Sequence, residues 1–449
     1  MKLSRLRHRL AAAVAAGACA LGLGSAAQAE TTVLKNFTLI DGTGAAPAPN
    51  SGLIIQDGRI TWVGPAASLR APAGASTVDL SGKYVMPGLI DLHVHLGNVV
   101  GVVQNKNNFT RENVEKDLTT FAKYGVTTVQ SMGTDGDLIF PLRAEQRAGR
   151  PNMARVYTAG QGLVFKGGYG GVPNLNNQVS TPAEATAEVN RQADKGVDFI
   201  KMWVDDELKT MPKMPPEITK AIIDAAHARK LRAVAHIFYL DDAKTLVNQG
   251  VDGFAHSVRD QKVDRALLDS MKRRGVWQIA ETLSREEYMF AYGKRAPFLD
   301  DPFFAKGVSP DVIATLASPQ RQQQQASNPH FHELPQFLDN AIANLAAQKA
   351  AGVKIGFGTD SGPPARFPGY SSHRELELMV KAGYTPAEAL HIATGVSAEF
   401  LGSKDLGLVK PNRWADLLVL DANPTTDIRN TRTIRAVYVA GREVPNINQ

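Results

Sequence analysis

Cysteine is almost absent from this chain: Cys19 is the only one among 449 residues. It lies in an amino-terminal segment that we expect to be removed, so the mature chain would contain none. A chain without cysteine has no disulfide, no thiolate nucleophile and no cysteine ligand for a metal ion. This absence suits an oxidising compartment outside the cytoplasm.

A basic stripe with interleaved aromatic residues is also missing, and this predicts that nucleic acid is not a partner. The net charge of +6 comes partly from the amino terminus, because residues 1–29 carry four of the Lys and Arg residues and no acidic one. Without that segment the net charge falls to +2. So small a charge does not predict a polyanionic partner.

The amino terminus has the layout of a secretory signal peptide. Four basic residues precede an Ala/Leu/Val/Gly-rich stretch over 10–25, and Ala27-Gln28-Ala29 forms a small-x-small cleavage site before Glu30. We therefore predict that residues 1–29 are a cleavable Sec-type signal, that the protein is periplasmic or secreted, and that the mature chain has no stable membrane association. An uncleaved membrane anchor is the alternative, since the apolar stretch approaches spanning length.

The most informative motif is Asp91-Leu92-His93-Val94-His95, which closes an apolar run over 85–90. Side chains two residues apart on a strand point to the same side, so both imidazoles can reach one metal ion from the carboxyl end of the strand. Polar side chains that end such a buried strand need a partner. The His-x-His pattern alone is weak evidence, because ordinary surface strands contain it often.

Both ends of the chain have the pattern of short strands separated by turns. An Asp-Gly pair at 57–58 lies between alternating apolar stretches, which is typical of a hairpin. Residues 415–420 and 434–442 have the same texture near the carboxyl terminus. We predict one small β-sandwich domain built from residues 30–83 and 403–449.

Residues 84–402 alternate strand and helix patterns, which predicts βα units around a parallel sheet. Eight candidate strands lie near 88–95, 126–132, 154–159, 197–203, 231–237, 251–256, 275–280 and 353–359. Helices are expected at 182–195, 216–229 and 240–249. Eight such repeats predict an α/β fold, a (β/α)8 TIM barrel. Residues 285–335 are predicted to be an insertion, a long loop over the barrel mouth, with a structureless surface excursion as the alternative.

Polar residues end several of the predicted strands, and in a barrel of this type the chemistry lies at the carboxyl ends of the strands. Alone, Lys201 could simply reach solvent and Asp360 could cap a helix. His236 and His256 could be hydrogen-bonded core histidines. Together with the His-x-His pair they make six side chains at five strand ends, a set that chance rarely produces.

The complete pattern resembles the metal-dependent amidohydrolase superfamily, specifically its imidazolonepropionase-like and prolidase-like branch. The resemblance covers nearly the whole chain after residue 29. Its motifs are 87–95, Phe199-Ile200-Lys201, Ala235-His236, Ala255-His256, Gly358-Thr359-Asp360 and 415–420. These motifs are specific for the superfamily and much less specific for the substrate.

The resemblance implies a centre of two divalent metal ions. The His-x-His pair and Asp360 would hold the more buried ion, and His236 and His256 would hold the other. Lys201 would be carboxylated by CO₂ and would bridge both ions, because a protonated lysine cannot be a ligand. These nitrogen and oxygen donors suit Zn²⁺, which is our default, and also Mn²⁺, Fe²⁺ or Co²⁺.

The mechanism that the resemblance implies uses Asp360 as both metal ligand and general base and acid. The sequence departs from the family where relatives often polarise the substrate carbonyl: Phe238 stands in place of a Tyr or His, and Gly167-Gly168-Tyr169 in place of Gly-Gly-His. Tyr169 and Tyr239 are the candidates for this catalytic task. Plain aromatic packing is the alternative for each.

Three cationic residues in the loops expected after strands three, six and eight are candidates for substrate binding. Lys166, Arg259 or Arg366 could bind a substrate carboxylate through charge-assisted hydrogen bonds. A solvated surface position is the alternative for each of them.

The resemblance to the superfamily and the export signal together imply an exported enzyme that hydrolyses an amide bond in a small molecule. The expected substrates are an N-acyl amino acid, an Xaa-Pro-type dipeptide or an amide-linked aromatic compound. Lactone or ester hydrolysis and hydrolytic deamination are alternatives on the same site, and the bridging lysine counts against deamination. A metal-free scaffold protein is the alternative of another class. Whether the chain forms a homo-oligomer is left open by the sequence.

Overall fold

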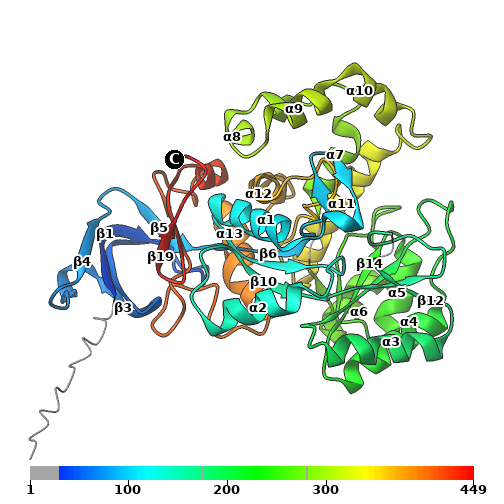
Figure 1. Ribbon diagram of the computed structural model, residues 1–449, viewed down its shortest axis with the longest axis horizontal. Coiled ribbons are helices and arrows are strands. Elements are labelled where there is room, and N and C mark those ends of the chain that lie inside the picture. The colour runs from blue at the N-terminus through cyan, green and yellow to red at the C-terminus, as the bar shows by residue number, and fades with distance from the viewer. Residues whose placement is uncertain (1–29, 174, 280–281) are drawn as a thin grey trace, which may run out of the picture.

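The computed structural model describes residues 30–173, 175–279 and 282–449. The predicted signal peptide and Cys19 therefore lie outside the described residues. Within the described ranges, no helix combines the length and the apolar character needed to cross a bilayer. Figure 1 shows a sheet formed by both chain ends at the left and a larger body of strands and helices at the right.

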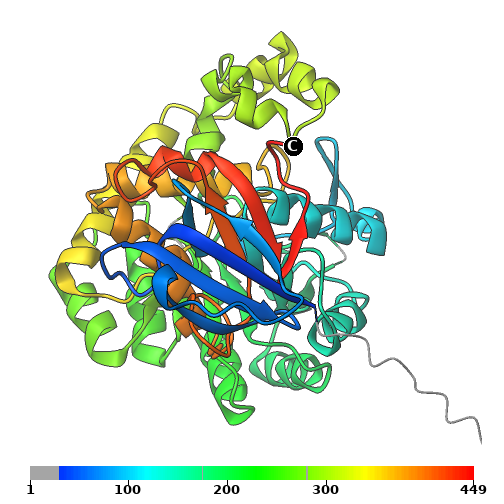
Figure 2. The same ribbon diagram turned by 90° about the vertical axis from the view of Figure 1, so that its left-hand side faces the viewer.

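The terminal sheet combines strands from both ends of the chain, as predicted, and Figure 2 shows them facing the viewer. Its strands are β1 (Thr31–Leu39), β2 (Ala48–Gln56), β3 (Arg59–Pro65), β4 (Ser76–Asp79), β5 (Tyr84–Pro87), β17 (Leu417–Leu420), β18 (Ile434–Val439) and β19 (Arg442–Val444). Their order is β19-β18-β17-β5-β1-β2-β3, with β4 beside β1. Parallel and antiparallel pairs both occur, so the strands form one mixed sheet where the sequence predicted a sandwich. β5 belongs to this sheet although it begins just past the predicted boundary at residue 83.

The predicted turn at Asp57-Gly58 joins β2 to β3. Both residues adopt positive φ angles, +50° and +82°, which a two-residue hairpin turn of this kind requires. Leu53 and Ile55, two residues apart on β2, are buried together with Ile60 of β3 in a core that belongs to this sheet. The alternating pattern and the turn signal therefore predicted the hairpin correctly.

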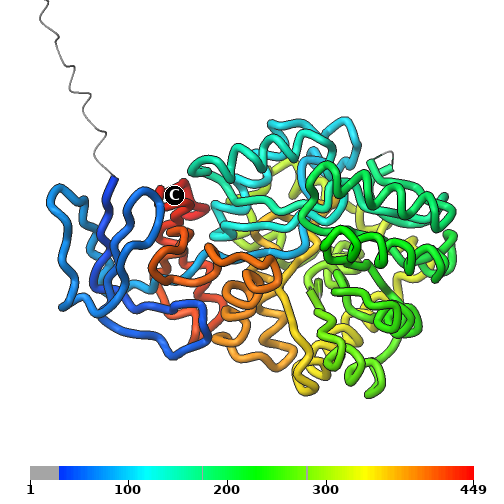
Figure 3. The backbone as a smooth tube through the Cα atoms, turned by 90° about the horizontal axis from the view of Figure 1, so that it is seen from below, coloured from blue at the N-terminus to red at the C-terminus, as the bar shows by residue number. Residues whose placement is uncertain are grey.

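The larger body contains two parallel sheets, ordered β10-β9-β6 and β12-β11-β13-β14-β15-β16. The strands are β6 (Leu89–Val94), β9 (Val126–Ser131), β10 (Arg155–Thr158), β11 (Leu163–Phe165), β12 (Asn177–Val179), β13 (Ile200–Val204), β14 (Ala233–Ile237), β15 (Gly253–Phe254) and β16 (Trp277–Gln278). A short hairpin, β7 (Val99–Val100) with β8 (Val103–Gln104), follows β6. In Figure 3 the terminal sheet lies at one end of the molecule and this body at the other.

The eighth predicted strand, 353–359, is present only as isolated bridges. Ile355 pairs in parallel with Gln278 of β16, and Ser361 pairs in parallel with Val94 of β6. The backbone N–H of Leu92 also donates to the carbonyl of Phe357 at 2.7 Å. This segment therefore runs between an edge of each parallel sheet.

Helices separate most of the parallel strands, as the alternating pattern predicted. They are α1 (Arg111–Lys123), α2 (Ile139–Ala148), α3 (Pro182–Asp194), α4 (Pro216–Ala228), α5 (Leu240–Gln249), α6 (Arg265–Arg274), α11 (Leu334–Ala351), α12 (Tyr370–Lys381), α13 (Pro386–His391) and α14 (Ser397–Phe400). Helix α3 illustrates why the starts were predictable. Thr181 caps it by accepting from the backbone N–H of Glu184, and Pro182 occupies the first turn.

Residues 285–335 are largely helical, which corrects the prediction of a long loop. The elements, seen at the top of Figure 1, are α7 (Leu283–Ala291), a 3-10 turn at Pro297–Asp300, α8 (Pro302–Ala305), α9 (Pro310–Ala317) and α10 (Pro319–Ala326). Proline misled the prediction because it fits the first turn of a helix. Three helices begin with a capping side chain and a proline, at Asp301-Pro302, Ser309-Pro310 and Ser318-Pro319.

Candidate metal centre

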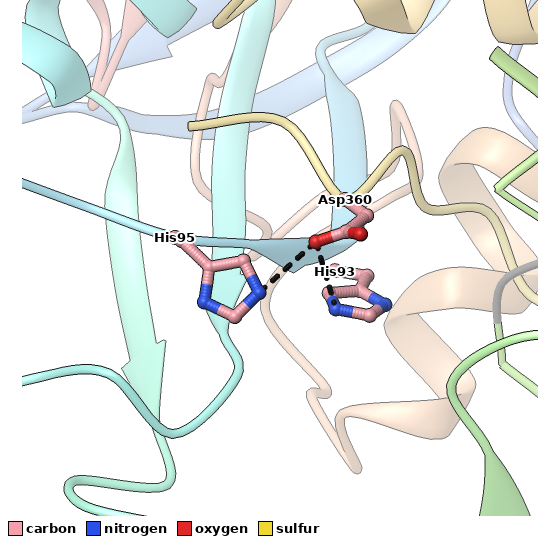
Figure 4. A group of neighbouring side chains, drawn as sticks. All are labelled: His93, His95 and Asp360. Carbon is pink, nitrogen blue, oxygen red and sulfur yellow. Dashed lines mark ion pairs between the residues drawn. The ribbon is translucent and has the colours of Figure 1, made fainter. Parts of the chain in front are cut away.

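The His-x-His pair at the end of β6 lies beside Asp360, as Figure 4 shows. The Nε2 atoms of His93 and His95 lie 3.4 and 3.0 Å from Oδ1 of Asp360. All three side chains are buried, and the ligand atoms that they offer lie within 4.8 Å of one another. Two imidazole nitrogens and a carboxylate oxygen at this spacing form a candidate metal site.

The backbone holds Asp360 against the strand that carries the histidines. Its N–H donates to the carbonyl of His93 at 2.7 Å, and its φ of +55° is uncommon for a residue other than glycine. The preceding Thr359 donates to the buried Asp91 from its backbone N–H at 3.1 Å and from its hydroxyl at 2.8 Å. A strained residue that its neighbours hold in this way is typical of functional sites.

Two further predicted ligands, His236 and His256, lie next to these three residues. The ring centroids of His256 and His93 lie 4.7 Å apart, and those of His236 and His256 lie 4.3 Å apart. The Nε2 atom of His256 lies 4.0 Å from Oδ2 of Asp360. Four imidazoles that come from β6, from β14 and from just after β15 therefore meet at one place.

The imidazoles of His93 and His95 each form a hydrogen bond through one ring nitrogen to a residue outside the cluster. Nδ1 of His93 is hydrogen-bonded to the carbonyl of Ala255, and Nδ1 of His95 to the hydroxyl of Thr134, both at 2.8 Å. Such bonds fix the orientation of the ring and leave Nε2 as the atom that faces Asp360. This is the usual arrangement around histidines that bind a metal.

The other two imidazoles are held in the same manner. Nδ1 of His256 is hydrogen-bonded to the hydroxyl of Thr282, and Nε2 of His236 to the Asp205 carboxylate, both at 2.8 Å. The contacts of the described residues thus leave Nε2 available in His256 and Nδ1 available in His236. In each ring one nitrogen is hydrogen-bonded to a partner outside the cluster, and the other can offer its lone pair to a metal ion, as a metal ligand requires.

Burial makes all four imidazoles neutral at pH 7. It lowers the pKa of His236 to about 4 and holds the pKa of His93 and of His256 well below the ordinary range. Burial also lowers the pKa of His95, against the attraction of the nearby carboxylate. A neutral imidazole has a lone pair available for a metal ion.

Lys201 on β13 is fully buried, and its Nζ atom has no hydrogen-bond partner among the described residues. Its Nζ atom lies 5.1 Å from the ring centroid of Trp203. Burial lowers the pKa of Lys201 to about 7, although the charge of Asp360 opposes this shift. Burying an amine without a partner is costly, so this position fits a lysine whose amine engages a further group.

Two arginines approach the Oδ2 atom of Asp360. Arg366 forms an ion pair with its Oδ2 atom, and Nε of Arg285 lies 3.6 Å from the same oxygen. Burial alone would raise the pKa of Asp360, but the charge of Arg366 and the neighbouring His93 hold it well below its ordinary value. Asp360 is therefore an ionised carboxylate at neutral pH.

Arg259, one of the predicted substrate-binding residues, is fully buried and already engaged. Its Nη1 atom lies 3.1 Å from Glu286, and its Nη2 atom donates to the carbonyl of Ile237 at 3.1 Å. Arg285 donates to the same oxygen of Glu286 at 2.7 Å. Arg259 thus helps to position this carboxylate and is less available to a ligand than Arg366.

The remaining predicted site residues differ in their distance from the cluster. The ring centroid of Tyr169 lies 5.3 Å from that of His236, and burial raises the pKa of Tyr169 to about 12. The hydroxyl of Tyr239 instead donates to Asp206 at 2.7 Å. Lys166 is exposed after β11. Tyr169 is therefore brought to the cluster, whereas neither Tyr239 nor Lys166 has a described contact with its histidines.

The sequence reasoning missed Asp205, Arg285 and Glu286. Asp205 carried a usable signal, because it directly follows strand β13 on the side where the other functional residues lie. Arg285 and Glu286 had no such signal, since they belong to the insertion, whose sequence has no strand end to place them.

This chain is similar to several known proteins. The imidazolonepropionase of Cereibacter sphaeroides is 24% identical over 416 residues, which cover 88% of this chain and 94% of that protein. A crystal structure from Bifidobacterium longum, provisionally assigned as a prolidase, superposes with a TM-score of 0.73 at 28% identity and covers 93% of this chain and 95% of its own. An Xaa-Pro dipeptidase with bound methionine gives 0.72 at 22% identity, with 92% and 99% covered.

The fold, the arrangement of the histidines around Asp360 and these relatives all indicate one superfamily of hydrolases. The model of the amidohydrolase family matches residues 84–444, which include every strand-end residue of the cluster. The chain therefore belongs to the amidohydrolase family.

Proposed function

We propose that this chain is an exported metal-dependent enzyme that hydrolyses an amide bond in a small molecule. The observation that carries the proposal is the meeting of four neutral imidazoles with the ionised Asp360 and the partnerless amine of Lys201. Proposed substrates are N-acyl amino acids, Xaa-Pro-type dipeptides and amide-linked aromatic compounds. The 28% identity with a provisionally assigned prolidase supports the dipeptide class.

The side chains present fit two divalent ions. His93, His95 and Asp360 would hold one ion, and the free nitrogens of His236 and His256 would hold the other. All the donors are nitrogen or oxygen atoms, which makes Zn²⁺ our default and also allows Mn²⁺, Fe²⁺ or Co²⁺. Because the four imidazoles are neutral and Asp360 is ionised, none of these five ligands has to lose a proton before it binds.

Lys201 would bridge the two ions as a carbamate. Its ammonium group would first lose one proton; the neutral amine nitrogen would then bond to the carbon of CO₂ and release a second proton. The loss of two protons in all would turn a cation into an anion with two oxygen donors. The reaction needs a neutral amine, and burial lowers the pKa of Lys201 far enough for a large neutral fraction near pH 7. The absence of a described hydrogen-bond partner for Nζ supports the same assignment.

The proton transfers would be the work of Asp360. Divalent ions held at this site would bring the pKa of water toward neutrality and polarise the substrate carbonyl. Asp360 would accept the proton of the attacking water and then donate it to the nitrogen of the leaving amine. Tyr169 is the better placed candidate for a hydrogen bond to the carbonyl oxygen, because Asp206 already engages the hydroxyl of Tyr239.

We also propose that the parallel strands close into the predicted (β/α)8 barrel. The bridges of Ile355 to Gln278 and of Ser361 to Val94 support closure through the eighth segment. On the other side, the backbone N–H of Asp198 before β13 donates to the carbonyl of Thr158 on β10 at 2.9 Å. Closure of this kind would bring all the strand-end residues to one mouth.

A substrate screen of the metal-loaded protein tests the proposed reaction. N-acyl amino acids, dipeptides and anilides would be compared with lactones and with heterocycles that release ammonia. We expect amine release from members of the first group and its loss after the metal is chelated. Hydrolysis of lactones alone would assign an esterase, and release of ammonia alone would assign a deaminase. No hydrolysis of any compound by metal-loaded protein would support a scaffold and contradict the proposal.

Asp205→Asn tests the outer partner of the proposed second ion. The amide can no longer accept the full charge-assisted hydrogen bond that orients His236, so we expect metal affinity to fall by about 10- to 100-fold. The measurement is a competition titration with a chelator. Asp206→Asn is the matched control, since that neighbour bonds to Tyr239 and not to a histidine. Equal affinities for the wild type and the Asp205 variant would contradict this role.

We propose that the enzyme works in the periplasm or outside the cell. The basic, apolar and small-x-small order of residues 1–29 supports export. Amino-terminal sequencing of protein recovered from the periplasm is expected to begin at Glu30. Recovery of uncleaved protein in the membrane fraction would instead favour the anchor.

A further inference from the structure

Arg285 is a buried cation whose position the fold fixes firmly. It lies in the first turn of α7, and the amino end of this helix is tied to α12, because Glu375 accepts from the backbone N–H groups of Leu283 and Ser284 at 2.8 and 2.7 Å. The residue is 8% exposed, and its Nε atom has no hydrogen-bond partner among the described residues. This nitrogen has only an ion-pair contact of 3.6 Å with Asp360, and a rigidly held donor without a hydrogen bond near the cluster indicates a place for a ligand.

Three guanidinium groups form ion pairs here with only two carboxylates, those of Glu286 and Asp360. Arg259 and Arg285 share one oxygen of Glu286, at 3.1 and 2.7 Å. Arg366 and Arg285 share one oxygen of Asp360. When Asp360 binds a metal ion, it offers less charge to the two arginines, and buried charge without a partner is costly.

We infer that Arg285 and Arg366 together bind a carboxylate of the substrate. Arg285 offers its free Nε atom, and the side chain of Arg366, which is 17% exposed, comes from the loop after Asp360. Two guanidiniums around one carboxylate can supply several charge-assisted hydrogen bonds in a fixed geometry. Arg259 also has two nitrogens, Nε and Nη1, without a hydrogen-bond partner among the described residues, but it is only 1% exposed and its contacts to Glu286 and Ile237 hold it in the interior. We therefore leave Arg259 out of this pair.

This inference rests on the proposed function and narrows its substrate class. The preferred compounds would carry a free carboxylate next to the scissile amide, as N-acyl amino acids and dipeptides do. Neutral anilides and lactones would be poor substrates. Glu207 is an exposed residue whose carboxylate interacts with the same arginines, so its substitution shows whether it acts as their counter-ion instead.

The test compares N-acetyl amino acids and dipeptides with the corresponding carboxamides, which differ only in the charge of the terminal group. For the metal-loaded wild type we expect kcat/KM to be at least about 10-fold higher for each free acid. Arg285→Gln and Arg366→Gln should each raise KM for the acids by about 10- to 100-fold. The values for the carboxamides should change by less than about threefold, and metal content should match the wild type.

Matched controls and a second measurement keep the inference falsifiable. Arg295→Gln removes an exposed arginine of the same insertion, one that pairs with Asp300, and should leave KM unchanged. Calorimetric binding of the free amino acid products should weaken in both site variants, with Arg366→Gln decisive if Arg285→Gln does not fold. A Glu207→Gln variant that lost acid selectivity would make Glu207 the organiser of this charge and overturn the assignment.

The failures of the two proposals are distinguishable. A wild-type enzyme that hydrolyses acids and carboxamides equally well, or whose KM changes equally for both in the variants, contradicts the carboxylate site and leaves the hydrolase intact. A protein that binds no metal and hydrolyses neither member of any pair contradicts the proposed function and this inference with it.

Discussion

Asp360→Asn is expected to lower kcat by about 10²- to 10⁴-fold, the usual size of a general acid–base contribution. The side-chain amide has nearly the same shape and keeps an oxygen that can bind a metal ion, but it cannot accept and return a proton. We therefore expect metal content close to that of the wild type. Steady-state kinetics and elemental analysis on the same sample measure both quantities.

The control for this substitution is Asp137→Asn, which makes the same chemical change at an exposed aspartate that pairs with Lys195. It should leave kcat and metal content unchanged. Full activity in the Asp360 variant would remove the proton-transfer role. Loss of metal together with activity would show that Asp360 acts mainly as a ligand.

Lys201→Ala is expected to lower activity by more than about 100-fold, which exceeds the usual loss from residues that only support a ligand. The substitution removes the proposed bridging carbamate, so the two ions would lose their common anionic ligand. Acetate or formate at millimolar concentration should restore part of the activity, because a free carboxylate can enter the space that the side chain leaves. The measurement is kcat with and without these anions.

Lys195→Ala is the matched control, since Lys195 is a partly exposed lysine that pairs with Asp137 outside the cluster. It should show neither the loss nor the rescue. If Lys201→Ala had wild-type activity in the absence of any added carboxylate, Lys201 would be a buried lysine without a catalytic purpose.

The sequence predicted the residues of the cluster better than their surroundings. His93 and His95 were predictable because a period of two on an apolar strand places both imidazoles on one side. Lys201, His236 and Asp360 could be added because parallel strands bring their carboxyl ends to one edge. In each case a short-range pattern together with one topological rule was sufficient.

The contacts that orient these side chains were not predictable in the same way. The Asp205 bond to His236 and the Arg366 bond to Asp360 join residues whose separation in the chain carries no periodic signal. The helices of 285–335 were missed because prolines at capped helix starts were taken for loop residues. Because these helices were not predicted, Arg285 was not identified as a site residue. Its position follows only from the packing of α7 on α12.

The mixed terminal sheet was predictable in part: its strands more than their pairing. Alternation of apolar residues predicted the strands β1, β2, β3, β17 and β18 but not β4 or β5, and the pair at Asp57-Gly58 predicted the first hairpin. The parallel pairing of β4 with β1 could not be predicted, because pairing partners depend on long-range packing and not on the strand's own pattern.

Metal content of the mature protein, purified in the presence of bicarbonate and measured by elemental mass spectrometry beside Lys201→Ala, tests the central claim most directly. The account predicts about two divalent ions per chain, as in two-metal hydrolytic sites, and a clear loss of metal in the variant. One ion per chain that is insensitive to the substitution would contradict the bridged centre, and no bound metal in either protein would contradict a metal-dependent enzyme altogether.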